Sequence, residues 1–98
     1  MQTPQDISLD FYEAVIANNG IRVEKILNNT LSSSIKIPLK TITGMLVIAV
    51  EYKLIESIDA ILKYNTYSFD KISYKHLDAI LLLASKLDLL KDLKISYH

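Results

Sequence analysis

Residues 46–62 read LVIAVEYKLIESIDAIL, and this stretch decides the fold. Its apolar residues recur at intervals of three and four, which is the periodicity of amphipathic α-helices. A similar pattern occurs 35 residues earlier, at residues 11–27, as FYEAVIANNGIRVEKIL, and 35 residues later, at residues 81–97, as LLLASKLDLLKDLKISY. A fixed period of roughly 20–50 residues is typical of proteins that stack copies of one supersecondary unit.

A small residue occupies the same position in each of the three stretches. Ala14, Ala49 and Ala84 are 35 residues apart, and each follows a large apolar residue by three positions. A small side chain lets the first helix of a hairpin approach the second helix closely. One such hairpin cannot bury its apolar face alone, whereas a stack of hairpins can. The third stretch is incomplete, because Ser96 and Tyr97 replace the Ile-Leu pair of the other two.

The whole chain, residues 1–98, is expected to form a single all-α domain, since its length suits one domain and half of its residues are hydrophobic. We expect about six short helices arranged as three stacked hairpins, without an extensive sheet. Asp6 or Ser8 can cap the first helix. Asn18-Asn19-Gly20 ends it, because Asn and Gly tolerate the positive φ that a helix C-terminus often needs.

The middle of the chain leaves one alternative open. Residues 35–40 alternate like a short extended arm, and Pro38 excludes a helix interior there. Thr43 can cap the helix that follows. The break Glu51-Tyr52-Lys53 holds neither Gly nor Pro. Residues 43–63 therefore form either two helices, which we favour, or one long helix.

The C-terminal part of the chain is predicted to hold a loop and two helices. The loop covers residues 65–73 and is rich in aromatic residues. Ser73 can cap the fifth helix, and Asp88 can cap a last short helix that runs toward the terminus.

Composition narrows the classes of function. Eleven basic residues balance eleven acidic ones and are spread along the chain, so nucleic-acid binding is not expected. Apolar runs such as residues 79–84 are much shorter than the roughly 20 residues of a membrane span, so no membrane contact is expected. The chain has no cysteine and no apparent signal peptide, which favours the reducing cytoplasm. Lysine greatly outnumbers arginine, which is typical of AT-rich viral or bacterial genomes.

Residues that could carry chemistry are few. His76 and His98 have no partners at the spacing of metal ligands, and the pair Asp88 and Asp92 is typical of a solvated helix face. No glycine-rich phosphate loop and no set of nucleophile and base is present. We therefore predict no catalytic, cofactor-binding or metal-binding residues, and no enzymatic activity.

Two groups of exposed candidates could bind another protein. Tyrosine and other aromatic side chains are enriched in interfaces, because they supply contact area at low entropic cost. The alternative is that the aromatic rings of residues 64–74 pack against the core of the stack. The run 81–83 covers more of a helix surface than one buried stripe, which favours a central helix, a homodimer contact or a large partner contact. The predicted partner-binding residues are Tyr64, Tyr67, Phe69, Tyr74, Leu82 and Leu83.

The register of the three stretches resembles the ankyrin repeat, and the resemblance covers most of the chain. In that family a first helix of the Leu-His-x-Ala type is followed, within about 33 residues, by a second helix of the Val-x-x-Leu-Leu type. Tyr12-Glu13-Ala14-Val15, followed by residues 23–29, is most similar to it. The chain lacks the Thr-Pro-Leu-His motif and the glycines of the family's turns, so a small helical bundle is the alternative. A fainter resemblance links residues 67–93 to the C-terminal part of a BTB domain, whose N-terminal sheet has no counterpart here.

An ankyrin-like stack implies a non-catalytic protein–protein interaction module, here as a viral or bacterial modulator of another protein. The alternatives are a small helical immunity or antitoxin-type inhibitor of an enzyme, and a nucleic-acid-binding helical protein. A homodimer is also compatible with the apolar surface.

Overall fold

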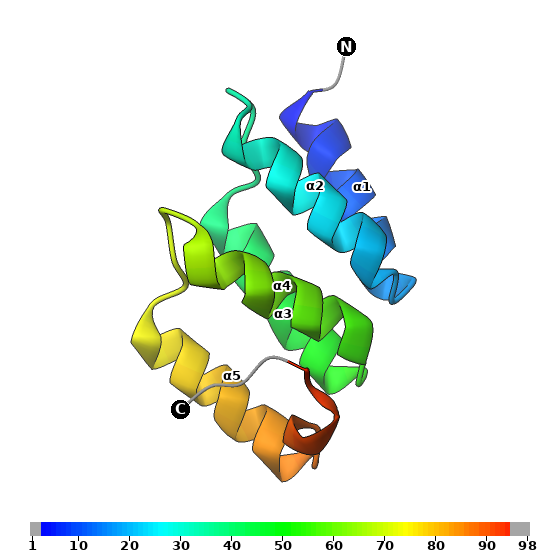
Figure 1. The fold of residues 1–98 in the computed structure, drawn as a ribbon, viewed down its shortest axis with the longest axis vertical. Coiled ribbons are helices and arrows are strands. Elements are labelled where there is room, and N and C mark those ends of the chain that lie inside the picture. The colour runs from blue at the N-terminus through cyan, green and yellow to red at the C-terminus, as the bar shows by residue number, and fades with distance from the viewer. Residues whose placement is uncertain (1–2, 95–98) are drawn as a thin grey trace.

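The computed structural model describes residues 3–94. Over these residues the chain forms five α-helices followed by one short 3-10 helix, arranged as in Figure 1. Their bounds are α1 Pro4–Ile16, α2 Gly20–Leu31, α3 Leu39–Glu51, α4 Ile55–Tyr67, α5 Tyr74–Lys86 and η1 Leu90–Asp92. No strand occurs within residues 3–94, and the predicted all-α fold of about six short helices is confirmed.

The helices form hairpins that stack in two layers (Figure 1). Within the hairpins, α1 packs against α2 and α3 packs against α4. Across the stack, α1 contacts α3, α3 contacts α5, and α2 contacts α4. The first helices thus form one layer and the second helices form the other, with η1 in place of a full second helix after α5.

The turn inside each hairpin has the same backbone conformation, and its central residue has a positive φ. These residues are Asn18 (54°), Lys53 (58°) and Asp88 (61°). In the middle hairpin, the N–H groups of Lys53 and Leu54 donate to the carbonyl oxygens of Val50 (3.1 Å) and Ala49 (2.8 Å). This Schellman motif satisfies carbonyl groups that a helix end leaves unpaired. It ends α3 without a glycine or proline, so residues 43–63 hold two helices.

The core lies between the two layers and contains the three equally spaced alanines. Ala14, Ala49 and Ala84 are at most 2% exposed, so each lies where helices pack. The largest fully buried apolar side chains around them are Phe11, Val15, Val23, Leu27, Leu46, Val50, Ile58, Ile61 and Leu62. These side chains come from α1 to α4, which places the centre of the core in the first two hairpins.

Buried Ser57, near the start of α4, joins the first two hairpins. Its hydroxyl donates to the carbonyl oxygen of Val15 at 2.8 Å, and its backbone N–H donates to Oδ1 of Asn18 at 3.0 Å. Polar groups at the end of α1 are thereby satisfied by the next hairpin, which fixes the two hairpins relative to each other.

The N-terminal cap differs from the predicted one. Thr3 caps α1 in place of Asp6 or Ser8. Its Oγ1 accepts from the Asp6 N–H (3.2 Å), and Asp6 Oδ2 accepts from the Thr3 N–H (3.0 Å). Such a capping box satisfies two backbone donors reciprocally, and Pro4 suits the first helical position because it has no N–H there.

The start of α3 also differs from the prediction. The helix begins at Leu39, so the extended arm expected at residues 35–40 ends at Pro38. Thr43 is not a cap, since it lies inside α3 and its Oγ1 donates to the carbonyl oxygen of Leu39 at 2.9 Å. Pro38 is tolerated at the N-cap because the amides at a helix start have no partner within the helix.

The aromatic segment contains less loop than predicted. α4 continues to Tyr67, so the loop expected over residues 65–73 begins only at Ser68. Buried Asn65 explains part of this, because its Oδ1 accepts from the N–H of Ile72 at 2.9 Å and so holds the connection against the helix end.

At the C-terminal end one predicted cap is confirmed and one is wrong. Ser73 caps α5, since its Oγ accepts from the N–H of His76 at 3.3 Å. Asp88 is the positive-φ residue of the turn and not a cap. The last helix is the short η1, and residues 95–98 lie outside the described part of the chain.

Candidate functional site

Two of the predicted partner-binding tyrosines take part in packing between helices. The rings of Tyr64 and Tyr67 on α4 meet edge to face, with their centroids 6.1 Å apart. The Tyr67 hydroxyl donates to Oδ1 of Asn28 on α2 at 2.7 Å. Tyr64 is half-buried against the core. These two rings therefore help to hold α2 and α4 together.

The other two aromatic residues point away from the protein. Phe69 has a relative exposure of 103%, and Tyr74, the first residue of α5, has 83%. The connection that carries Phe69 is nevertheless held in place. Lys71 Nζ donates to the carbonyl oxygens of Thr66 (3.1 Å) and Ser68 (2.7 Å), and the side chain of Ile72 is buried.

The leucines of α5 divide between the core and the surface. Leu83 is half-buried and packs against the core, as does Leu81, whereas Leu82 is exposed. α5 is thus not a central helix, since among the described helices it packs against α3 and η1 at one end of the stack. Of this run, Leu82 is the residue available for contact with another protein.

Leu82 belongs to a row of apolar residues whose other members, Tyr12 and Val47, were not predicted from the sequence. Tyr12 on α1, Val47 on α3 and Leu82 on α5 are 35 residues apart, and all three are exposed or half-exposed. Because their helices have the same relative bounds, we infer that they lie on one face of the first-helix layer, and we call them the outer row. Exposed Leu9 and Ile16 extend it along α1. The signal was the 35-residue period, which orders exposed positions as well as buried ones.

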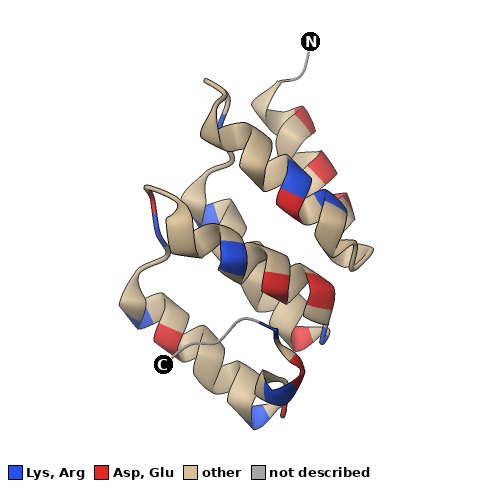
Figure 2. Cartoon of the chain, in the orientation of Figure 1, with Lys and Arg blue, Asp and Glu red and all other residues tan. Residues whose placement is uncertain are grey.

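Charged residues are unevenly distributed over the molecule, although the net charge is zero. Lysines lie at the N-terminal ends of α3 and α5 and in the connections that precede these helices (Figure 2). We call this group the lysine edge; its members are Lys36, Lys40, Lys71 and Lys75, and all four are exposed. The expectation that basic residues are merely spread out is true of the sequence but not of the surface.

A groove of about 460 Å³ over α2, α4 and the C-terminal segment contains matched charges. Lys63 Nζ is 2.9 Å from Oε1 of Glu24, and the hydrogen bond and negative charge of Glu24 raise the pKa of Lys63. Lys94 Nζ is 3.7 Å from Oε2 of Glu56, and its backbone N–H donates to the Asp59 carboxylate at 2.9 Å. These contacts join neighbouring hairpins, and their exposed ion pairs contribute little net stability.

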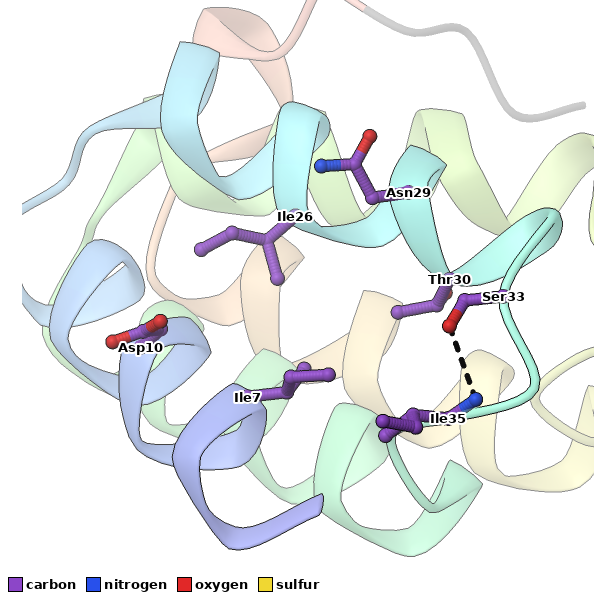
Figure 3. Close-up of a pocket in the computed structure, with 7 residues that line it drawn as sticks. All are labelled: Ile7, Asp10, Ile26, Asn29, Thr30, Ser33 and Ile35. Atoms are coloured by element: carbon purple, nitrogen blue, oxygen red, sulfur yellow. Dashed lines mark hydrogen bonds between the residues drawn. The ribbon is translucent and has the colours of Figure 1, made fainter. Parts of the chain in front are cut away.

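A smaller hollow of about 160 Å³ lies at the N-terminal end of the stack (Figure 3). Three isoleucines, Ile7, Ile26 and Ile35, line it together with polar side chains at its margin. Residues 35 positions later, among them Ile42 and Ile61, are buried in the second hairpin. We infer that the hollow belongs to a face which, in the second hairpin, is covered by the first.

The described histidine and acidic side chains do not gather into a metal-ligating cluster. Residues 3–94 contain no group of three or more His, Asp or Glu side chains that could hold a metal ion. His76 is exposed on α5, and its backbone N–H donates to the Oγ of Ser73 in the helix cap. His98 lies outside the described residues. None of the described helices has both the length and the apolar character needed to cross a membrane.

Comparisons with protein-family models, with curated proteins and with solved structures gave no match. The proposals below are therefore argued from this chain's own residues.

Proposed function

We propose that this chain is a non-catalytic protein–protein interaction module that modulates a partner protein. The observation that carries the proposal is the pair of outward-facing aromatic side chains, Phe69 and Tyr74, at one edge of the hairpin stack. Burial of a phenylalanine side chain contributes about 1.5–3 kcal/mol of favourable free energy, which a partner that covers Phe69 would gain.

The backbone around Phe69 supports the proposal. Lys71 and Asn65 hold the connection through hydrogen bonds to its backbone, and Ile72 anchors it in the core. A ring presented on a fixed backbone loses little conformational freedom when a partner covers it. Single exposed apolar residues are common on proteins, but here two aromatic residues are five positions apart on a restrained segment.

We further propose that the hairpins are ankyrin-like copies of one unit. Three features support this: helix starts 35 residues apart, a shared turn conformation, and one buried alanine in each first helix. The connections at residues 32–38 and 68–73 would take the place of the family's β-turn fingers. Phe69 would then lie on a finger, and loops on a rigid scaffold often carry binding residues.

The proposal is tested by affinity capture with the variant Phe69→Ala/Tyr74→Ala. We expect this variant to lose the partners that the natural chain captures. Tyr52→Ala is the matched control, because Tyr52 is also exposed but follows α3 at its C-terminal end. Tyr67 is left unchanged, since its replacement would also break the contact with Asn28. An unchanged set of partners for the double variant would refute the proposal.

Self-association is a second candidate, favoured by the outer row. Tyr12 and Leu82 are exposed on one face of the first-helix layer, and Leu9 adds apolar surface beside Tyr12. Contiguous apolar surface of this kind often marks an interface. Sedimentation at high concentration should then give a dimer that Tyr12→Glu/Leu82→Glu dissociates, whereas a mass of 11.1 kDa for the natural chain would exclude this candidate.

A further inference from the structure

The lysine edge gathers positive charge through the stacking of hairpins. Lys36 and Lys71 are 35 residues apart, and so are Lys40 and Lys75. α3 packs against α5, and the two helices have equivalent bounds, so their N-terminal ends lie at the same edge of the molecule (Figure 2). The partial positive charge of both helix N-termini adds to that of the side chains.

Two of these lysines are held in position by the protein. The ammonium group of Lys36 donates to the carbonyl oxygen of Thr30 in the last turn of α2. The ammonium group of Lys71 donates to the carbonyl oxygens of Thr66 and Ser68 at the end of α4. An ammonium group has three donors, so both keep capacity for a further acceptor. Such restraint reduces the entropy that the side chains lose on binding.

No acidic side chain within residues 3–94 forms a salt bridge with the lysines of the lysine edge. The ion pairs found among residues 3–94 engage other basic residues, namely Arg22, Lys63, Lys91 and Lys94. Asp70 follows Phe69, and Asp78 lies one turn after Lys75, but neither makes a salt bridge with the edge within the described part of the chain. The four lysines are thus exposed and make no ion pair within residues 3–94, and Phe69, two positions before Lys71, is exposed as well.

We propose that the lysine edge binds an extended acidic segment of a partner protein, an inference that rests on the proposed function. Packed helices lie about 8–10 Å apart, and an extended chain in the polyproline II conformation advances about 3.1 Å per residue, with side chains on the same face about every three residues. Carboxylates three residues apart therefore match lysines on neighbouring hairpins. Phe69 and Tyr74 receive apolar side chains that lie between those carboxylates. A nucleic acid is disfavoured, because Asp70 places a negative charge next to the ring on which a base would stack.

The test is fluorescence anisotropy with labelled probes of about twelve units. The probes are a peptide with Glu at every third position, the same peptide with Lys in place of Glu, and single-stranded oligothymidine. Lys40→Glu/Lys75→Glu is the test variant, because neither side chain makes a hydrogen bond or ion pair within residues 3–94 that folding would lose. Lys25→Glu/Lys86→Glu is the control, since it changes the net charge equally at exposed positions elsewhere.

We expect the Glu peptide to bind, and binding to weaken with salt, since exposed charges are screened over about 10 Å at 0.1 M. The test variant should bind about tenfold more weakly, and the control should change little. Absence of binding, or equal weakening by both variants, would overturn the inference. If oligothymidine binds more tightly than the Glu peptide and through the same lysines, the inference is overturned and the ligand of the lysine edge is a nucleic acid.

Affinity capture with both double variants distinguishes failure of the acidic-segment proposal from failure of the proposed interaction function. If capture of partners requires Phe69 and Tyr74 but survives Lys40→Glu/Lys75→Glu, the interaction function stands and the acidic segment is refuted. If capture requires neither pair, both proposals fail.

Discussion

At the scale of single residues, the two glycines occupy contrasting environments. A Cβ added to Gly20 would lie 2.7 Å from the backbone oxygen of Glu56, so the absence of a side chain lets α2 approach α4. A Cβ added to Gly44 would meet nothing within 4 Å. Gly44 lies inside α3, where glycine is entropically unfavourable.

These environments predict opposite effects of the same substitution. Gly44→Ala should raise the free energy of unfolding by about 0.5–1 kcal/mol, because alanine has the higher helix propensity. Gly20→Ala should lower it by about 1–3 kcal/mol, because the helices must separate to admit the methyl group. Urea denaturation followed by circular dichroism measures both. Equal effects of the two variants would mean that α2 and α4 do not approach each other closely at Gly20.

At the scale of elements, each hairpin is defined by a buried alanine and a positive-φ turn. Ala49 is fully buried in α3, between neighbours on both sides of the stack. The turn that follows has Lys53 at φ 58°, a conformation that costs a non-glycine residue energy. The Schellman hydrogen bonds and the packing of α3 against α4 offset this cost.

Ala49→Leu is expected to destabilise the protein by about 1–3 kcal/mol through overpacking between helices. Thermal unfolding monitored by circular dichroism gives the difference in stability. Ala79→Leu on the exposed surface of α5 is the control, and it should be nearly neutral. If Ala49→Leu proves equally neutral, the small side chain is not what allows the helices to approach.

At the scale of the whole molecule, the ends of the stack differ from its middle. α3 packs against α1, α4 and α5, whereas α5 packs mainly against α3 and η1 among the described helices. Stacked hairpins contact mainly their neighbours, so a terminal unit with fewer contacts opens more readily. The clustering of positive charge also depends on the whole stack, since the lysines of the lysine edge come together only when the hairpins are in register.

Hydrogen exchange should reveal the weaker end. Amides of α5 should exchange about tenfold or more faster than those of α3, since local opening of α5 exposes less buried surface. Mass spectrometry of peptic fragments compares residues 74–86 with residues 39–51. Equal protection of the two segments would indicate that the whole stack opens as one cooperative unit.

Part of the fold could be predicted because it depends on short-range patterns. The three-four periodicity, the equal spacing of Ala14, Ala49 and Ala84, and the cap at Ser73 are all local, and the structure bears them out. The start of α3 was placed at Thr43 because threonine caps helices well in general. Pro38 competes for that role, since the N–H that proline lacks has no partner within the helix at its start, and local preference does not decide between the two.

The candidate surface was less predictable. All four tyrosine and phenylalanine candidates are equally aromatic, yet Tyr67 bonds to Asn28 from 39 positions away, whereas Phe69 is fully exposed. That difference depends on which hairpin packs beside which, and no local pattern encodes it.

By itself, the sequence determined the all-α class and the 35-residue spacing of the buried alanines, because hydrophobic periodicity acts along a single helix. Only the tertiary structure decided which aromatic rings are free and that distant lysines share one edge. The physical reason is that stacking brings equivalent positions of successive hairpins side by side, so surface chemistry depends on register between segments far apart in the chain.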